Sequence, residues 1–137
     1  MALIEFNIGE VTKDIEARVE DGLVVCGTQG VSWAADRMRA NGSVVTGNLI
    51  NSLTYSTDKE QGPISGGTKG TQIEISDTPL TVHIGTNVVY GPRVEFGFVG
   101  KDSLGRYYNQ PAKSYLRAGI LANKSKIMAI LTKAVRG

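Results

Sequence analysis

Apolar residues recur at steps of three or four from Val11 to about Ala40, and this period is typical of one long amphipathic helix. Three glycines, Gly22, Gly27 and Gly30, fall inside the pattern. Each costs about 1 kcal/mol relative to alanine in a helix interior. They therefore predict either a break near the middle of the helix or close packing along a face of small residues.

The pair Asn41-Gly42 predicts the end of this helix, because glycine readily adopts the left-handed conformation that stops one. A short helical turn around Leu49 is expected next, with the hydroxyl of Thr46 as its cap. A strand is then predicted from Leu53 to Thr57.

Residues 58–70 are rich in Gly, Lys, Ser and Thr and lack an apolar period, so they predict a long exposed hairpin loop. Residues 72–76 and 80–85 alternate polar and apolar side chains on either side of a turn at 77–79. This pattern predicts an antiparallel hairpin with one covered face. The residues expected to line that face are Leu53, Tyr55, Ile73, Ile75, Leu80, Val82 and Ile84.

Pro111 stands where the first turn of a helix tolerates proline, and helical spacing then continues to the end of the chain. No internal repeat or long linker divides residues 1–137, so a single domain is expected. The predicted fold class is α+β, with a long N-terminal helix and a C-terminal helix packed on a small antiparallel sheet that carries a long hairpin loop. The apolar positions of the last helix are Ala112, Leu116, Ile120, Ile127, Leu131 and Ala134.

The chain of 137 residues is 41% hydrophobic and has no run near the roughly 18 apolar residues that a membrane span needs. Its start lacks the pattern of a signal peptide. We therefore expect a soluble protein that is made in the cytoplasm and does not contact a membrane. The one cysteine, Cys26, has no second cysteine for a disulfide and no nearby histidine for a metal site.

Charge is distributed unevenly although the net charge is only +2. Residues 1–30 carry six acids and two bases, whereas no acid follows Asp102. This asymmetry suggests either contact between unlike faces of neighbouring subunits or a surface that tolerates phosphate, and a solvated basic helix face carries equal weight. The bases after Asp102 are Arg106, Lys113, Arg117, Lys124, Lys126, Lys133 and Arg136.

The sequence predicts no catalytic residue, metal ligand or cofactor. Residues 62–71 approach a phosphate-loop pattern, but Thr68 occupies the lysine position and a strand-like segment follows. His83 is the only histidine and has no acid or cysteine spaced for a proton relay. Cys26 and Trp33 are both expected in the core, with an interface as the alternative for Trp33. We expect a protein that is not an enzyme.

One segment, residues 82–97, carries more specific information, and it reads VHIGTNVVYGPRVEFG. It resembles the phage neck and tail-completion family typified by gene product ten of the lambda-like coliphages. Members of that family read Val-Gly-Thr, a Tyr-Ala or Tyr-Gly-Pro step, then Val-Glu-Phe-Gly. The long first helix, residues 46–53 and Pro111-Ala112 match the family in order. Departures are Ser43-Val44, where the family often has proline, and residues 107–110, which replace a Pro-Phe-Leu step.

The resemblance implies a structural virion protein, a subunit of the head-tail connector ring (the neck) of a long-tailed phage. Its implied partners are copies of itself, the connector or head-completion protein, and the tail-terminator or tail-tube protein, with genomic DNA passing non-specifically through the ring. The implied location is the virion neck, after synthesis in the host cytoplasm. A tail terminator or another minor tail subunit is the first alternative, and a small enzyme or nucleic-acid-binding module is the last.

Two groups of residues are candidates for structural or interface roles. Glu95 lies between apolar neighbours, so we expect its carboxylate to accept backbone hydrogen bonds or to pair with an arginine, with a solvated turn acid as the alternative. The structural or interface candidates are Thr46, Gly47, Leu49, Gly85, Tyr90, Pro92, Glu95 and Gly97. The candidates for a DNA channel or an inter-subunit contact are Lys113, Arg117, Lys124, Lys126 and Lys133.

Overall fold

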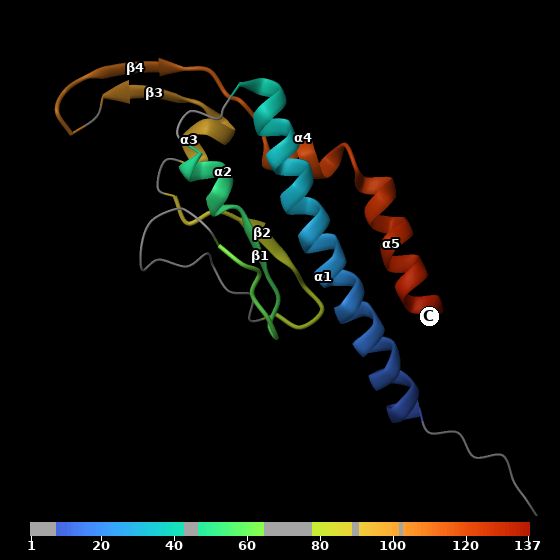
Figure 1. The fold of residues 1–137 in the computed structure, drawn as a ribbon. Helices are drawn as coiled ribbons and strands as arrows, with labels where there is room; N and C mark the ends of the chain where they lie inside the picture. Colours follow the sequence, from blue (N-terminus) through green and yellow to red (C-terminus); the bar gives the residue numbers. More distant parts are fainter. Residues whose placement is uncertain (1–7, 43–46, 65–77, 89–90, 102) are drawn as a thin grey trace, which may run out of the picture.

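The computed structural model describes residues 8–42, 47–64, 78–88, 91–101 and 103–137, and these residues form an α+β fold (Figure 1). The predicted fold class is thereby confirmed. The described strands form two separate antiparallel pairs, β1 with β2 and β3 with β4, where a single sheet was expected. In chain order the elements are α1 (Ile8–Asn41), α2 (Asn48–Ser52), β1 (Thr54–Ser56), β2 (His83–Gly85), α3 (Gly91–Phe96), β3 (Phe98–Lys101), β4 (Tyr107–Gln110), α4 (Leu116–Leu121) and α5 (Lys124–Arg136).

Helix α1 runs without interruption for 34 residues, through all three of its interior glycines. It ends at Asn41, and Gly42 follows with φ of +74°, the predicted left-handed stop. A β-carbon at Gly22 would lie 2.8 Å from Cβ of Ala134, and one at Gly27 would lie 2.6 Å from Cγ of Tyr55. Close packing is therefore the reason for the glycines, because they let α5 and β1 approach the helix backbone.

Strands β1 and β2 lie along one side of α1, with Tyr55 opposite Ile84 (Figure 1). The chain turns directly after β1, where the amide of Gly62 donates to the carbonyl of Tyr55 at 2.8 Å and the amide of Thr57 donates to the carbonyl of Glu60 at 2.8 Å. The start of the predicted exposed loop is thus a tight turn that pairs back on β1. Its remainder, residues 65–70, lies outside the described residues.

The prediction of a strand over residues 80–85 is wrong at the start of that strand. Leu80, expected on the covered face, sits in the turn before β2 with φ of +55° and is 45% exposed. Pairing with β1 begins only at His83, because the turn at Thr78–Leu80 occupies the residues before it. Val82 and Ile84 are half-buried as expected for a covered face, and the predicted strand at 72–76 lies outside the described residues.

The core lies where the second half of α1 meets α2, α3 and the start of α4. Trp33 does not belong to this cluster; it is half-buried and lines a pocket of about 240 Å³ between α1 and α4, so the expectation of a core tryptophan is corrected. Cys26 is buried, and burial raises the pKa of its thiol. The buried cluster consists of Ala34, Ala35, Met38, Leu49, Leu53, Val88 and Tyr115.

The C-terminal part departs most from the prediction. Pro111 does not open a helix, because residues 107–110 form strand β4 and the helix begins only at Leu116. The predicted helix is also interrupted, since α4 ends at Leu121 and α5 begins at Lys124, with Asn123 between them. Helix α5 packs on α1 with Leu131 and Ala134 against Gly22, the face that the spacing predicted.

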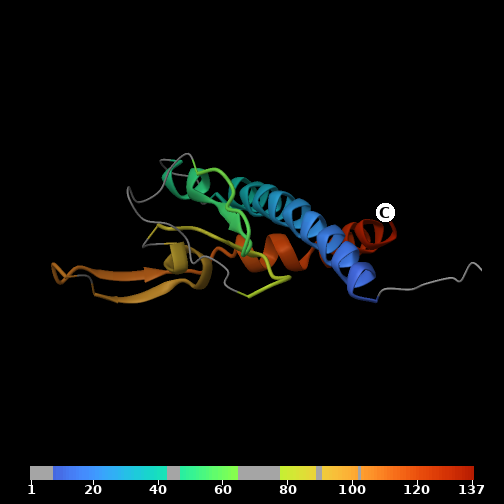
Figure 2. The ribbon, with the colours of Figure 1, turned by 90° about the horizontal axis from the view of Figure 1, so that it is seen from below.

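Strands β3 and β4 form an arm that projects from the end of the molecule opposite the start of α1 (Figures 1 and 2). We call these two strands, together with residues 103–106 before β4, the β3–β4 arm. Three of its apolar side chains, Val99, Leu104 and Tyr107, are 67%, 75% and 64% exposed. A two-stranded ribbon is marginally stable alone in water, so this arm depends on how its base is held.

Candidate functional site

The site that the structure builds around the Val-Glu-Phe-Gly step is a buried carboxylate at the base of the arm. Glu95, near the end of α3, is 2% exposed and points at the first residues of α4. Its Oε2 accepts hydrogen bonds from the amides of Tyr115 at 2.7 Å and Leu116 at 2.9 Å. Its Oε1 accepts from the hydroxyl of Ser114 at 2.9 Å and from the amide of Arg117 at 2.9 Å. One carboxylate thus satisfies the first amides of a helix 20 residues downstream.

Arg117 completes this cluster, which we call the Glu95 cluster. Its Nε donates to Oε1 of Glu95 at 2.9 Å and its Nη2 donates to the backbone carbonyl of the same residue at 3.3 Å. Its guanidinium also lies 4.4 Å from the ring centroid of Phe96. Glu95 therefore meets both halves of its prediction, since it accepts backbone hydrogen bonds and pairs with an arginine of its own chain.

The electrostatics of the cluster keep Glu95 ionised. Burial by itself raises the pKa of this carboxyl group, because it removes water from the charged form. The hydrogen bonds from Arg117 and from the amides of Tyr115 and Leu116 outweigh burial and lower the pKa from 4.5 to about 2. The carboxylate is consequently a fixed negative charge and a poor proton donor or acceptor near neutral pH.

Tyr115 ties the cluster to the core. Its ring is 1% exposed, and its hydroxyl donates to the carbonyl of Gly91 at the start of α3 at 3.0 Å. Burial and the nearby charge of Glu95 raise the pKa of the hydroxyl well above its usual value. Helix α3 is thus held at its first residue by Tyr115 and near its end by the amides beside Tyr115.

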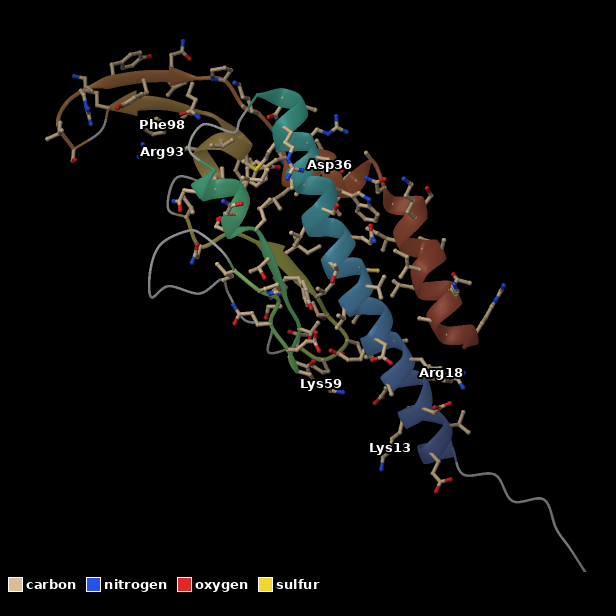
Figure 3. All side chains as sticks on the ribbon, viewed as in Figure 1. Lys13, Arg18, Asp36, Lys59, Arg93 and Phe98 are labelled. Atoms are coloured by element: carbon tan, nitrogen blue, oxygen red, sulfur yellow. The ribbon has the colours of Figure 1, made fainter. Side chains whose placement is uncertain are left out.

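The same contacts fix the base of the β3–β4 arm. Gly97, the residue between α3 and β3, has φ of +78°, and a β-carbon there would lie 2.8 Å from the carbonyl oxygen of Gln110. The amide of Lys113 donates to the carbonyl of Val94 at 2.8 Å. The guanidinium of Arg93 lies 4.0 Å from the ring centroid of Phe98, and both side chains are seen at the base of the arm in Figure 3. The arm therefore leaves the core in a defined direction.

The other structural candidates lie in separate places. Gly47 precedes α2 in the left-handed conformation, with φ of +83°, and as the residue at the N-cap position it has no side chain to offer the helix. Leu49 is buried in the core, Gly85 pairs with Thr54 at the end of β2, and Pro92 is exposed in the first turn of α3. Thr46 and Tyr90 lie outside the described residues. Of the structural candidates that the structure describes, only Glu95 and Gly97 lie at the base of the arm, with Pro92 at the far end of the same helix.

The basic candidates also divide. Arg117 is bound in the Glu95 cluster and Lys113 is exposed beside it. Lys124, Lys126 and Lys133 are exposed on α5, and within the described residues none of them forms an ion pair. Helix α5, which carries these three lysines, lies along α1 and away from the arm (Figure 1). They do not form one site with the Glu95 cluster.

The sequence did not predict that Ser114 and Tyr115 belong to this cluster, nor that Arg117 is the arginine of Glu95. The one available signal was Ser114, because serine before a helical stretch is typical of a helix start. Among the described residues there is no group of three or more His, Cys, Asp or Glu that could hold a metal ion. His83 is half-buried in β2.

Comparisons with protein families, curated proteins and solved structures find no match for this chain. In the part of the chain that the structure describes, no helix is both long and apolar enough to cross a membrane.

Proposed function

We propose that the chain is a structural subunit of the head-tail connector ring, the neck, of a long-tailed phage. The observation that carries the proposal is the Glu95 cluster at the base of the arm. The residues of the resemblance, Val-Glu-Phe-Gly at 94–97, hold the base of a projecting ribbon through hydrogen bonds, an ion pair and close backbone packing.

The exposed apolar surface of the arm supports an assembly role. Val99, Leu104 and Tyr107 are each more than 60% exposed on the arm. Contiguous exposed apolar groups on a monomer are typical of surfaces that bind another protein. A ring subunit needs surfaces of this kind on two sides, because each copy contacts two neighbours.

The charge of α5 suits the same proposal. Its exposed outer side carries three lysines and Arg136 and no acid. A surface of this kind meets either an acidic face of a neighbour or the phosphates of DNA that passes through the ring. The contact with DNA would be non-specific.

Removal of the protein from the phage that encodes it tests the proposal. With a nonsense codon early in the gene, we expect DNA-filled heads and complete tails to accumulate separately, and a plasmid copy of the gene should restore joined virions. Normal virions from the nonsense variant would contradict the proposal. Joined virions with tails of irregular length would instead indicate a tail terminator, because length control belongs to that position.

A further inference from the structure

We infer that the β3–β4 arm of one subunit binds the exposed start of α1 on a second copy of this chain. This inference rests on the proposed ring, and it names the two surfaces that join its subunits. The start of α1 is defined here as residues 9–17, and every residue in this stretch is exposed.

The start of α1 continues the surface on which α5 packs. Helix α5 ends beside Arg18, whose Nη1 donates to the carbonyl of Val135 at 3.2 Å. Val11 and Ile15 precede Gly22 by eleven and seven residues, so all three share one side of the helix. The apolar stripe that α5 covers at Gly22 therefore extends beyond the end of α5, where Val11 and Ile15 are 50% and 40% exposed.

One face of the arm complements the apolar stripe at the start of α1. Val99 pairs with Asn109 and Lys101 pairs with Tyr107, so the four side chains share a face. That face offers two apolar groups and one base.

The start of α1 offers two apolar groups flanked by acids. Glu10, Asp14 and Glu16 lie in this stretch against one base, Lys13. Apolar groups with charges of opposite sign around them are typical of specific protein interfaces.

The arm and the start of α1 lie at opposite ends of the molecule in both views (Figures 1 and 2), and Figure 3 marks Lys13 and Arg18 at the α1 end. Two complementary patches at opposite ends of one chain make a head-to-tail contact, which is the kind that closes into a ring when the rotation between copies allows it. A two-fold dimer would instead bring identical patches together.

Cross-linking of the purified full-length protein tests the inference. We would combine Ile15→Cys and Tyr107→Cys in one chain and treat it with a short bismaleimide. Both positions are exposed, so the fold should tolerate the changes, and circular dichroism checks this. The wild type is the control, because its only cysteine is buried.

We expect the double variant to give a ladder of cross-linked species that ends at one closed ring. A mixture of the two single variants should stop at dimers, and each single variant alone should give none. Lys101→Glu should lower the yield about five-fold at low salt, and Asp14→Lys added to it should restore the yield. The salt bridge of Asp14 with Arg18 is exposed, so its loss in this variant has little effect on stability.

Several outcomes overturn the inference. Dimers from either single variant alone would indicate a two-fold contact. If no ladder of cross-linked species forms at any concentration at which the protein is soluble, the arm binds a different protein and not a second copy of this chain. The interface and the connector role are tested separately. If the protein forms the cross-linked ladder but is absent from virions, the interface stands and the connector role is wrong. If the protein forms a ring in virions but gives no ladder, the connector role stands and this interface is wrong.

Discussion

Glu95→Gln tests how much the base of the arm depends on one charge. The substitution keeps the size of the side chain but removes the charge, and it places an NH₂ group where one oxygen accepts hydrogen bonds. One amide hydrogen-bond donor among Tyr115, Leu116 and Arg117 would then face another donor. The pKa of Glu95 falls from 4.5 to about 2, which corresponds to about 3 kcal/mol of stability at neutral pH.

The pH dependence follows from the direction of the shift. Because the pKa is lower in the folded state, the stabilisation is complete well above pH 4.5 and is lost as the pH falls toward about 2. We therefore expect Glu95→Gln to lower the free energy of unfolding by about 3 kcal/mol at pH 7 and by about 1 kcal/mol at pH 3. Urea unfolding at both pH values measures this difference.

The matched control is Glu16→Gln, an exposed carboxylate on α1, which should change the free energy of unfolding by less than about 0.5 kcal/mol. A Glu95→Gln variant as stable as wild type at pH 7 would show that the carboxylate is only a solvated turn acid. A difference that stays constant between pH 7 and pH 3 would show that the loss is one of packing and not of charge.

Three further substitutions test other contacts by the same unfolding assay. Tyr115→Phe should lose about 1 to 2 kcal/mol, because it leaves the buried carbonyl of Gly91 without its donor; an unchanged stability would refute that role. Gly119→Ala should destabilise by about 1 to 3 kcal/mol, because its β-carbon would lie 2.9 Å from the backbone oxygen of Trp33; a gain in stability would contradict the close packing of α4 on α1. Glu20→Met should stabilise the protein, because this buried carboxylate has no hydrogen-bond partner in the described structure, and a large loss would reveal a partner.

The parts of the fold that the sequence predicted have one covered face. Helix α1 and the packed face of α5 followed from spacing, because apolar residues of α1 from Leu23 to Met38 and those of α5 around Leu131 pack on neighbouring elements. The β3–β4 arm was missed for the opposite reason. Neither of its faces is buried in the core, so no alternation of polar and apolar residues marks it in the sequence.

Sequence prediction was limited in a similar way at the candidate site. The apolar neighbours of Glu95 predicted that its carboxylate needs hydrogen-bond partners. They did not predict which residues supply them, because Tyr115 and Leu116 lie about 20 residues away and donate through backbone amides that carry no sequence signal. Because a helix was expected to begin at Pro111, the actual start of α4 at Leu116 was not predicted. Glu95 accepts hydrogen bonds from the amides at this start. Pairings between distant backbone groups depend on the completed fold.

Cryo-electron microscopy of the virion neck tests the proposed connector role without any variant of the protein. We expect a ring of identical subunits between head and tail into which this fold fits, with the β3–β4 arm of each copy on the start of α1 of the next and the DNA path through the centre. A neck whose density is fully explained by other proteins, with this chain absent from the virion, would contradict it.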